Sequence, residues 1–139
     1  MELGIKRFEN PQELLRYIDS QLADIRKKLG ELLRVIEDLR AKTEQVEKLK
    51  SIVSALTGEE TAVATSENVI NLDAVSVVIN PSPSTELRSA EELAESLNKK
   101  LGELQSARRD VEKIVSANIE SSLEVVIVDG VPKTIMIKL

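Results

Sequence analysis

Leucine and isoleucine recur at alternating spacings of three and four residues in the N-terminal part of the chain. This spacing lines one side of an α-helix and is the heptad pattern of helices that pair. The predicted helix covers residues 10–57, because Asn10 can cap it, Pro11 suits its first turn, and Gly58 can end it. Its apolar seam consists of Leu15, Ile18, Leu22, Ile25, Leu29, Leu32, Ile36 and Leu39.

This first predicted helix is roughly 70 Å long at about 1.5 Å per residue. A domain of this chain's size is narrower than that, so the helix has to project or to pack against another helix. After Leu39 the same phase meets Thr43 and Lys50, and an apolar phase then resumes with Val46, Leu49, Val53 and Leu56. The shift predicts a stammer or a change of helix partner.

A second helix is predicted over residues 85–118, with Ser82 or Ser84 as its cap. Its apolar stripe is interrupted by Arg108, and it adds Leu97, Leu101 and Leu104 to the expected interaction seam. We expect Arg108 to extend its charged end to water at the edge of the stripe. The alternative is that Arg108 pairs with a facing carboxylate and fixes the register of the helices.

Three strands are expected around this second helix. A polar linker is predicted at residues 58–68, one covered strand at residues 69–79, and a β-hairpin at residues 123–139. Since a strand, a helix and a further strand in one sheet form a right-handed crossover, we expect the strand at 69–79 to lie parallel to one hairpin strand.

The register of the terminal hairpin is predicted from cross-strand matching. Placing Leu123 opposite Leu139 and Val125 opposite Ile137 pairs apolar residues with each other and brings Glu124 to Lys138. A two-residue turn at Asp129-Gly130 would instead set Glu124 opposite Ile135. We therefore expect the longer loop, with Gly130 to Pro132 at its tip.

The predicted fold class is α+β. It has two long heptad-patterned helices, as a coiled-coil-like helical hairpin or an oligomeric bundle, and a small three-stranded sheet in the order α-β-α-β-β. With 139 residues the chain suffices for one domain, so residues 1–139 are expected to form a single domain.

The amino-acid composition excludes several classes of catalytic and metal-binding function. The chain has no His, Cys or Trp, which removes thiolate and imidazole chemistry, disulfides and the usual zinc ligands. Pairs such as Glu59-Glu60 and Glu91-Glu92 are adjacent in sequence, so on a helix they point in different directions and do not converge for acid–base work. We therefore expect no enzymatic activity, no catalytic residues, no cofactor and no metal; a metal site built of carboxylates alone is a remote alternative.

Charge and hydropathy bear on the partners. With 19 basic and 24 acidic residues, the net charge of −5 gives no basis for binding nucleic acid. No apolar run approaches the ~20 residues of a membrane span, and no signal peptide opens the chain, so a cytoplasmic protein is expected. Abundant charge with Val and Ile, and no Cys or His, is a composition that suits a heat-adapted source.

One short repeat occurs, Lys-Lys-Leu-Gly-Glu-Leu, at Lys27–Leu32 and again at Lys99–Leu104. One interpretation is that its glycines permit the close approach of a neighbouring helix. Chance is the favoured interpretation, because most of these residue types are common in any charged helix.

Two long heptad helices, at residues 10–57 and 85–118, joined through β-structure resemble the prefoldin chaperone subunits, whose helical arms project from a β platform that assembles the oligomer. This chain departs from that pattern, because a hairpin follows its second helix whereas the family's strands lie between the helices. The first function expected is a non-enzymatic coiled-coil assembly or scaffold protein that forms a homo-oligomer or binds another coiled-coil protein. The alternative is a prefoldin-like chaperone that holds unfolded clients.

Overall fold

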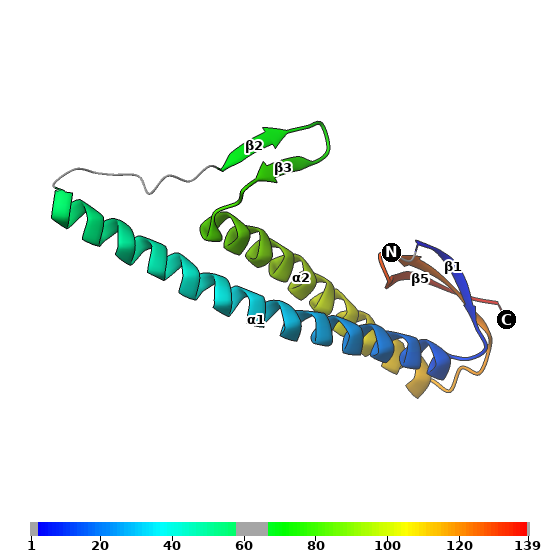
Figure 1. Cartoon of the computed structure of the whole chain (residues 1–139). Coiled ribbons are helices and arrows are strands. Elements are labelled where there is room, and N and C mark those ends of the chain that lie inside the picture. The colour runs from blue at the N-terminus through cyan, green and yellow to red at the C-terminus, as the bar shows by residue number, and fades with distance from the viewer. Residues whose placement is uncertain (1–2, 58–66, 139) are drawn as a thin grey trace. The chain divides into compact units, whose positions relative to one another are not determined.

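The computed structural model describes residues 3–57 and 67–138. Its elements follow the order β1 (Leu3–Phe8), α1 (Pro11–Thr57), β2 (Asn68–Asn71), β3 (Ser76–Ile79), α2 (Pro83–Ser116), β4 (Leu123–Val128) and β5 (Val131–Ile137) (Figure 1). The α+β class and both long helices are confirmed. The predicted strand order is wrong in two places, and most of the predicted linker, residues 58–66, lies outside the described residues.

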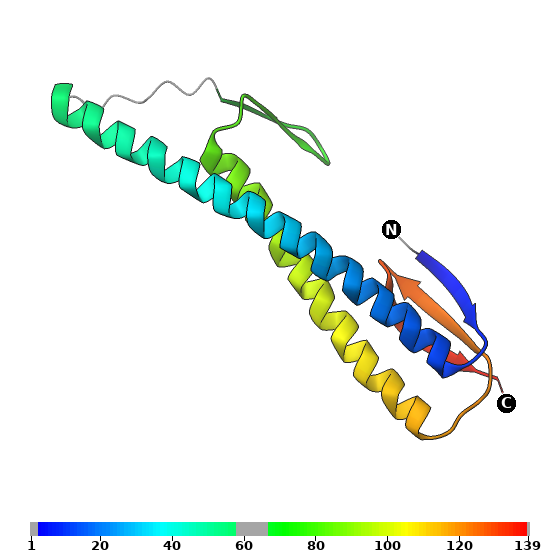
Figure 2. The same cartoon turned by 60° about the horizontal axis from the view of Figure 1, so that its bottom comes forward.

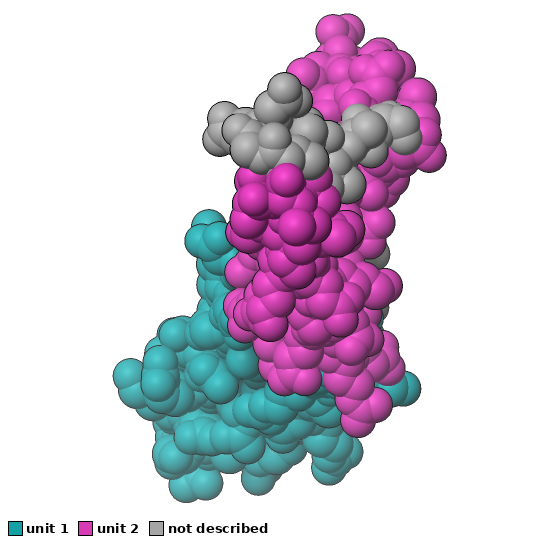
Figure 3. Space-filling view, turned by 60° about the vertical axis from the view of Figure 1, so that its left-hand side comes forward, with its two compact units in different colours: residues 1–30, 95–139 teal, residues 31–94 magenta. Residues whose placement is uncertain are grey.

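The chain divides into two compact units (Figure 3). Unit 1 comprises residues 1–30 and 95–139, and unit 2 comprises residues 31–94. Each unit therefore contains one part of α1 and one part of α2, and within each unit these parts run antiparallel to one another (Figure 2). The prediction of one domain over the whole chain stays a prediction.

The start of α1 follows from its capping residues. The backbone N–H of Glu13 donates to the side-chain oxygen of Asn10 at 2.9 Å, as expected of an N-cap. The Glu13 carboxylate in turn accepts from the backbone N–H of Glu9 at 2.9 Å, so one more backbone donor near the helix start is satisfied. These two bonds fix the beginning of the helix within one residue of its predicted start.

Unit 1 holds a three-stranded antiparallel sheet in the order β1-β4-β5 and the main hydrophobic core. Alternate residues of the central strand β4 are buried, namely Leu123, Val125 and Ile127. The two helices supply most of the rest of this core, together with Phe8 of β1 and Val131 of β5. The buried apolar side chains of the helices in unit 1 are Leu14, Ile18, Leu22, Ile25, Leu29, Leu104 and Val111.

Strand β1 has no counterpart in the predicted order. It pairs with β4, with Phe8 opposite Leu123 and Lys6 opposite Val125. Opposite residues share a face of the sheet, so the core-side positions of β1 are Gly4, Lys6 and Phe8, only one of them apolar. The Lys6 ammonium lies 4.9 Å from the Tyr17 ring centroid, a cation–π contact that accommodates a charge on that face. The strand was missed because it lacks an alternating apolar signal.

The predicted hairpin register is wrong. Val128 pairs directly with Val131, so the turn has two residues, Asp129 and Gly130, with φ of 57° and 76°. Two positive φ angles are those of a type I′ turn, which suits the twist of a hairpin. The pairing of Glu124 with Ile135 that argued against this turn does not occur, because a bulge between Val126 and Ile127 shifts the register by one residue.

The bulge has an identifiable cause. Pro132 lies opposite Ile127 and Thr134 opposite Val126, which leaves Lys133 as the extra residue on β5. Pro132 has no N–H to donate to the ladder, so a bulge is tolerated beside it. The contact between Glu124 and Lys138 is confirmed at 3.5 Å, although Glu124 now lies opposite Met136.

The single strand predicted at residues 69–79 is also wrong. It is a separate hairpin, in which Val69 lies opposite Val78 and Ile70 opposite Val77. Between the strands, the Leu72 N–H donates to the Val75 carbonyl at 2.9 Å. Neither strand pairs with β4 or β5 in the described part of the chain, so the predicted parallel crossover is wrong too. The available turn signal was Asn71 followed by Asp73, hidden within a β-branched run.

Substitution of the turn glycine should destabilise unit 1. A Cβ added at Gly130 would lie 2.9 Å from Gln21 Oε1, and the positive φ strains any L-residue. We expect Gly130→Ala to lower the free energy of unfolding by about 1–2 kcal/mol, measured by urea denaturation. Gly102→Ala is the matched control, because a Cβ there has nothing within 4 Å, and loss of a helical glycine should stabilise by about 0.5–1 kcal/mol. Effects of the same sign would contradict this account.

Candidate interaction surface

The residues of the predicted interaction seam do not share one environment. Ile18, Leu22, Ile25, Leu29, Ile36, Leu39 and Leu104 are buried within a single chain, and Leu15, Leu32, Leu97 and Leu101 are half-buried. The sequence reasoning missed Leu14, which is fully buried although it lies beside the predicted seam. Whether any seam residue contacts another chain stays a prediction.

The expectation that Arg108 extends to water is wrong, and the alternative pairing holds. The guanidinium Nε of Arg108 on α2 donates to Asp19 Oδ1 on α1 at 2.6 Å, and a second nitrogen pairs with Glu112. This bond to Asp19 and the attraction of its charge raise the pKa of Arg108. Because both groups of the Asp19 pair are substantially exposed, the contact fixes register more than it adds stability.

Exposed apolar side chains concentrate in unit 2. Of the fourteen large apolar residues exposed in the described part of the chain, twelve belong to unit 2. Among the described residues of unit 2, the buried apolar ones are Ile36, Leu39 and Ala94. Unit 1 thus holds most of the buried apolar side chains, whereas most of the exposed ones belong to unit 2. Its exposed set is Leu33, Val35, Leu49, Ile52, Leu56, Val69, Ile70, Leu72, Val75, Val77, Ile79 and Leu93.

One part of this surface is the C-terminal end of α1. Arg40 on α1 pairs with Glu91 on α2 at 3.4 Å, so these two residues lie side by side on the antiparallel helices. Because α2 begins at Pro83, eight residues before Glu91, α1 has no α2 residue beside it beyond about Lys48. The side chains of Leu49, Ile52 and Leu56 in this overhang are 50%, 56% and 81% exposed. Residues 51–57 carry no charge.

The other part is the β2–β3 hairpin. Opposite residues share a face, so Ile70, Val77 and Ile79 lie on one face, and Val69 and Val78 on the other. All of these are exposed except Val78, which is half-buried. The face of Ile70, Val77 and Ile79 is therefore exposed, and in the described part of the chain neither edge of the hairpin pairs with a further strand.

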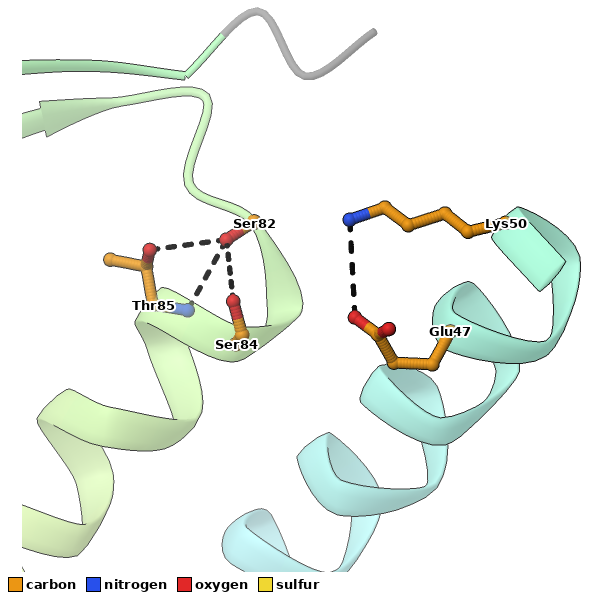
Figure 4. A network of polar contacts seen from close by, with 5 residues as sticks. All are labelled: Glu47, Lys50, Ser82, Ser84 and Thr85. Atoms are coloured by element: carbon orange, nitrogen blue, oxygen red, sulfur yellow. Dashed lines mark hydrogen bonds and ion pairs between the residues drawn. The ribbon is translucent and has the colours of Figure 1, made fainter. Parts of the chain in front are cut away.

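The hairpin is joined to α2 by a capped helix start. The Thr85 N–H donates to the Ser82 hydroxyl oxygen at 3.3 Å, so the predicted cap by Ser82 is confirmed (Figure 4). The Ser82 N–H donates to a Glu67 carboxylate oxygen at 3.1 Å, so the residue before β2 is bonded to the residue before α2. Figure 4 also shows the Glu47–Lys50 ion pair on α1, at 3.9 Å.

The carboxylate of Glu67 should titrate below its usual pKa of 4.5. Hydrogen bonds from the Thr85 hydroxyl and from the Ser82 N–H lower this pKa, with a smaller contribution from the charge of Arg88. A pKa lowered by folding contributes stability at pH values above the unfolded pKa, and that contribution is lost as the pH falls through the folded value. We expect the Ser82 amide resonance in NMR to shift as Glu67 titrates, below pH 4.5.

The control for this titration is Glu67→Gln, which keeps an oxygen acceptor and removes the charge. Its Ser82 resonance should not shift over that pH window. An ordinary or raised pKa for Glu67 in the native chain would contradict the hydrogen-bonded arrangement.

Other sites in the described residues offer little convergent chemistry. No group of three or more acidic side chains close enough to hold a metal ion occurs there. An open groove between α2 and the β4–β5 turn is lined by lysines and carboxylates together, and Lys133 pairs with Glu103 at 3.7 Å beside it. Among the helices described, neither is long and apolar enough to cross a membrane.

Comparisons of this chain with protein-family models, with curated proteins and with solved structures return no match. The exposed surfaces of unit 2 are therefore the feature of this chain from which a function can be proposed.

Proposed function

We propose that this chain is a non-enzymatic assembly or scaffold protein of the cytoplasm, acting through oligomerisation and protein–protein contacts. One observation carries this proposal: twelve of the fourteen exposed large apolar residues in the described chain lie in unit 2. Large exposed apolar patches are uncommon on monomeric proteins and mark sites of association, so a concentration of exposed apolar side chains in one unit supports this function.

In this proposal the two heptad-patterned helices have separate roles along their length. The seam residues buried in a single chain, such as Ile25 and Leu104, hold α1 and α2 together as a coiled-coil-like hairpin. The exposed end of α1 and the β2–β3 hairpin are then the surfaces left for a homo-oligomer or for another coiled-coil protein. Their burial is favourable, because each large aliphatic side chain removed from water contributes about 1.5–3 kcal/mol.

The mass of the native chain in solution tests the proposal. We expect light scattering coupled to size exclusion to give a mass above the 15.4 kDa of one chain, and to fall towards it on dilution. Dilution matters because an association equilibrium depends on concentration, whereas the mass of a monomer does not. A measured mass equal to that of one chain at high micromolar concentration would contradict the oligomerisation part of the proposal.

The alternative is a prefoldin-like chaperone that holds unfolded clients. Its support is the overhanging end of α1, where Leu56 is 81% exposed and charge is absent over residues 51–57. Uncharged apolar surface at a helix end can bind unfolded chains of varied sequence, because hydrophobic contact is non-directional. The two functions differ in whether this end is covered by a fixed partner or stays open to clients.

A further inference from the structure

The two sheets of this chain differ in how their edges are protected. The outer strand β1 carries Lys6 and Arg7, and the outer strand β5 carries Pro132 and the bulged Lys133. Charges, prolines and bulges on edge strands are the features that keep sheets of different molecules from pairing. Strands β2 and β3 contain none of these features, since their sequences are Asn-Val-Ile-Asn and Ser-Val-Val-Ile.

The unprotected hairpin is also too small to be stable by itself. An isolated two-stranded hairpin is marginal in water, and three or more strands with an apolar face are needed for independent stability. Each strand of this hairpin has four residues, and its apolar face of Ile70, Val77 and Ile79 is exposed. The hairpin therefore gains from further strands at an edge.

We infer that a second copy of this chain supplies those strands, by edge-to-edge pairing of the two β2–β3 hairpins. This inference rests on the proposed function and names its partner and its surface. Two hairpins give four strands, which passes the three-strand minimum. Two-fold pairing of identical edges is self-complementary, because each strand presents the same backbone donors and acceptors to its copy.

At the hairpin, charge does not oppose a second copy as the partner. The whole chain has a net charge of −5, so two copies repel one another over most of their surfaces. In the hairpin, residues 68–79, the only charged residue is Asp73, in the turn and away from the paired strands. The edges can therefore meet without placing like charges opposite each other.

The test adds lysine to each strand, as β1 and β5 already have. Val69→Lys with Val77→Lys places the two charges on different faces, so that they do not oppose each other within the hairpin. The control, Ile5→Lys with Val128→Lys, adds the same charge on strand side chains of unit 1 that are 67% and 40% exposed and lie outside the proposed surface. We expect the hairpin variant to weaken self-association at least about tenfold in Kd by sedimentation equilibrium, and the control to leave it close to native.

A second measurement needs no variant and so does not depend on the folding of one. Amides of residues 68–71 and 76–79 in the native chain should exchange with solvent more slowly at high than at low protein concentration. A hairpin variant that associates as tightly as the native chain, or hairpin exchange that is independent of concentration in an oligomer, would overturn the inference and leave the proposed assembly function standing. If the native chain has the mass of a single copy at every concentration, both the inference and the proposed assembly function are contradicted. That mass is measured before any variant is made.

Discussion

We expect Leu104→Ala to lower the free energy of unfolding by about 2–5 kcal/mol, a large part of the total stability of a small protein. Leu104 on α2 is fully buried in unit 1, so alanine leaves a cavity that the surrounding side chains fill only in part. Urea denaturation followed by circular dichroism measures the loss.

The matched control is Leu93→Ala, the same substitution on the same helix at a side chain that is 52% exposed. Its effect on the native monomer should stay within about 0.5 kcal/mol, as for most surface changes. The difference between the two variants should not change with protein concentration, because Leu104 is buried within one chain. A difference that grows with concentration would show instead that Leu104 is covered by another copy.

The sequence predicts the helices well because their signals are local. The limits of α1 are within one residue of the prediction, since Asn10 and Pro11 specify its start and Gly58 specifies its end. For α2 the structure begins at Pro83 and ends at Ser116, two residues before the predicted limits at each end. Ser82 was among the predicted caps. Because proline is favoured at the first helical position, Pro83 after this cap marks the start of the first turn.

The strands are predicted less well, because their pairing depends on residues distant in sequence. The core-side residues of β1 include Gly4 and Lys6, which carry no pattern of a buried strand until β4 and the Tyr17 ring are placed beside them. The register of β4 and β5 was wrong because one bulge at Lys133 changes every pairing beyond it.

The candidate surface shows the same division between local and distant information. Sequence spacing identified apolar positions such as Ile25 and Leu56 equally, since both lie on a helical stripe. It could not tell that Ile25 is buried and Leu56 is 81% exposed, because that depends on where α2 begins along α1. The Arg40–Glu91 and Asp19–Arg108 pairs show which residues of α1 lie beside which residues of α2. Neither pair can be predicted from the apolar pattern of a single helix.

The end of α1 provides the test that separates assembly from client binding. We expect Ile52→Glu with Leu56→Glu to reduce self-association by at least about a hundredfold in Kd, because two exposed aliphatic side chains of about 1.5–3 kcal/mol each are lost from the contact. The replaced side chains lie outside the core, so circular dichroism and the urea midpoint of unit 1 should stay native. Sedimentation equilibrium and the aggregation of a heat-denatured client enzyme are measured on the same sample.

Each combination of these two measurements has a distinct meaning. Loss of mass with no native effect on the client supports the assembly function, because the helix end is then a fixed interface. Unchanged mass with loss of a native ability to suppress aggregation supports the chaperone alternative, because the helix end then binds clients while assembly proceeds elsewhere. If neither property changes, the overhang of α1 belongs to neither surface, and the β2–β3 hairpin remains as the exposed apolar surface of unit 2 that can carry association.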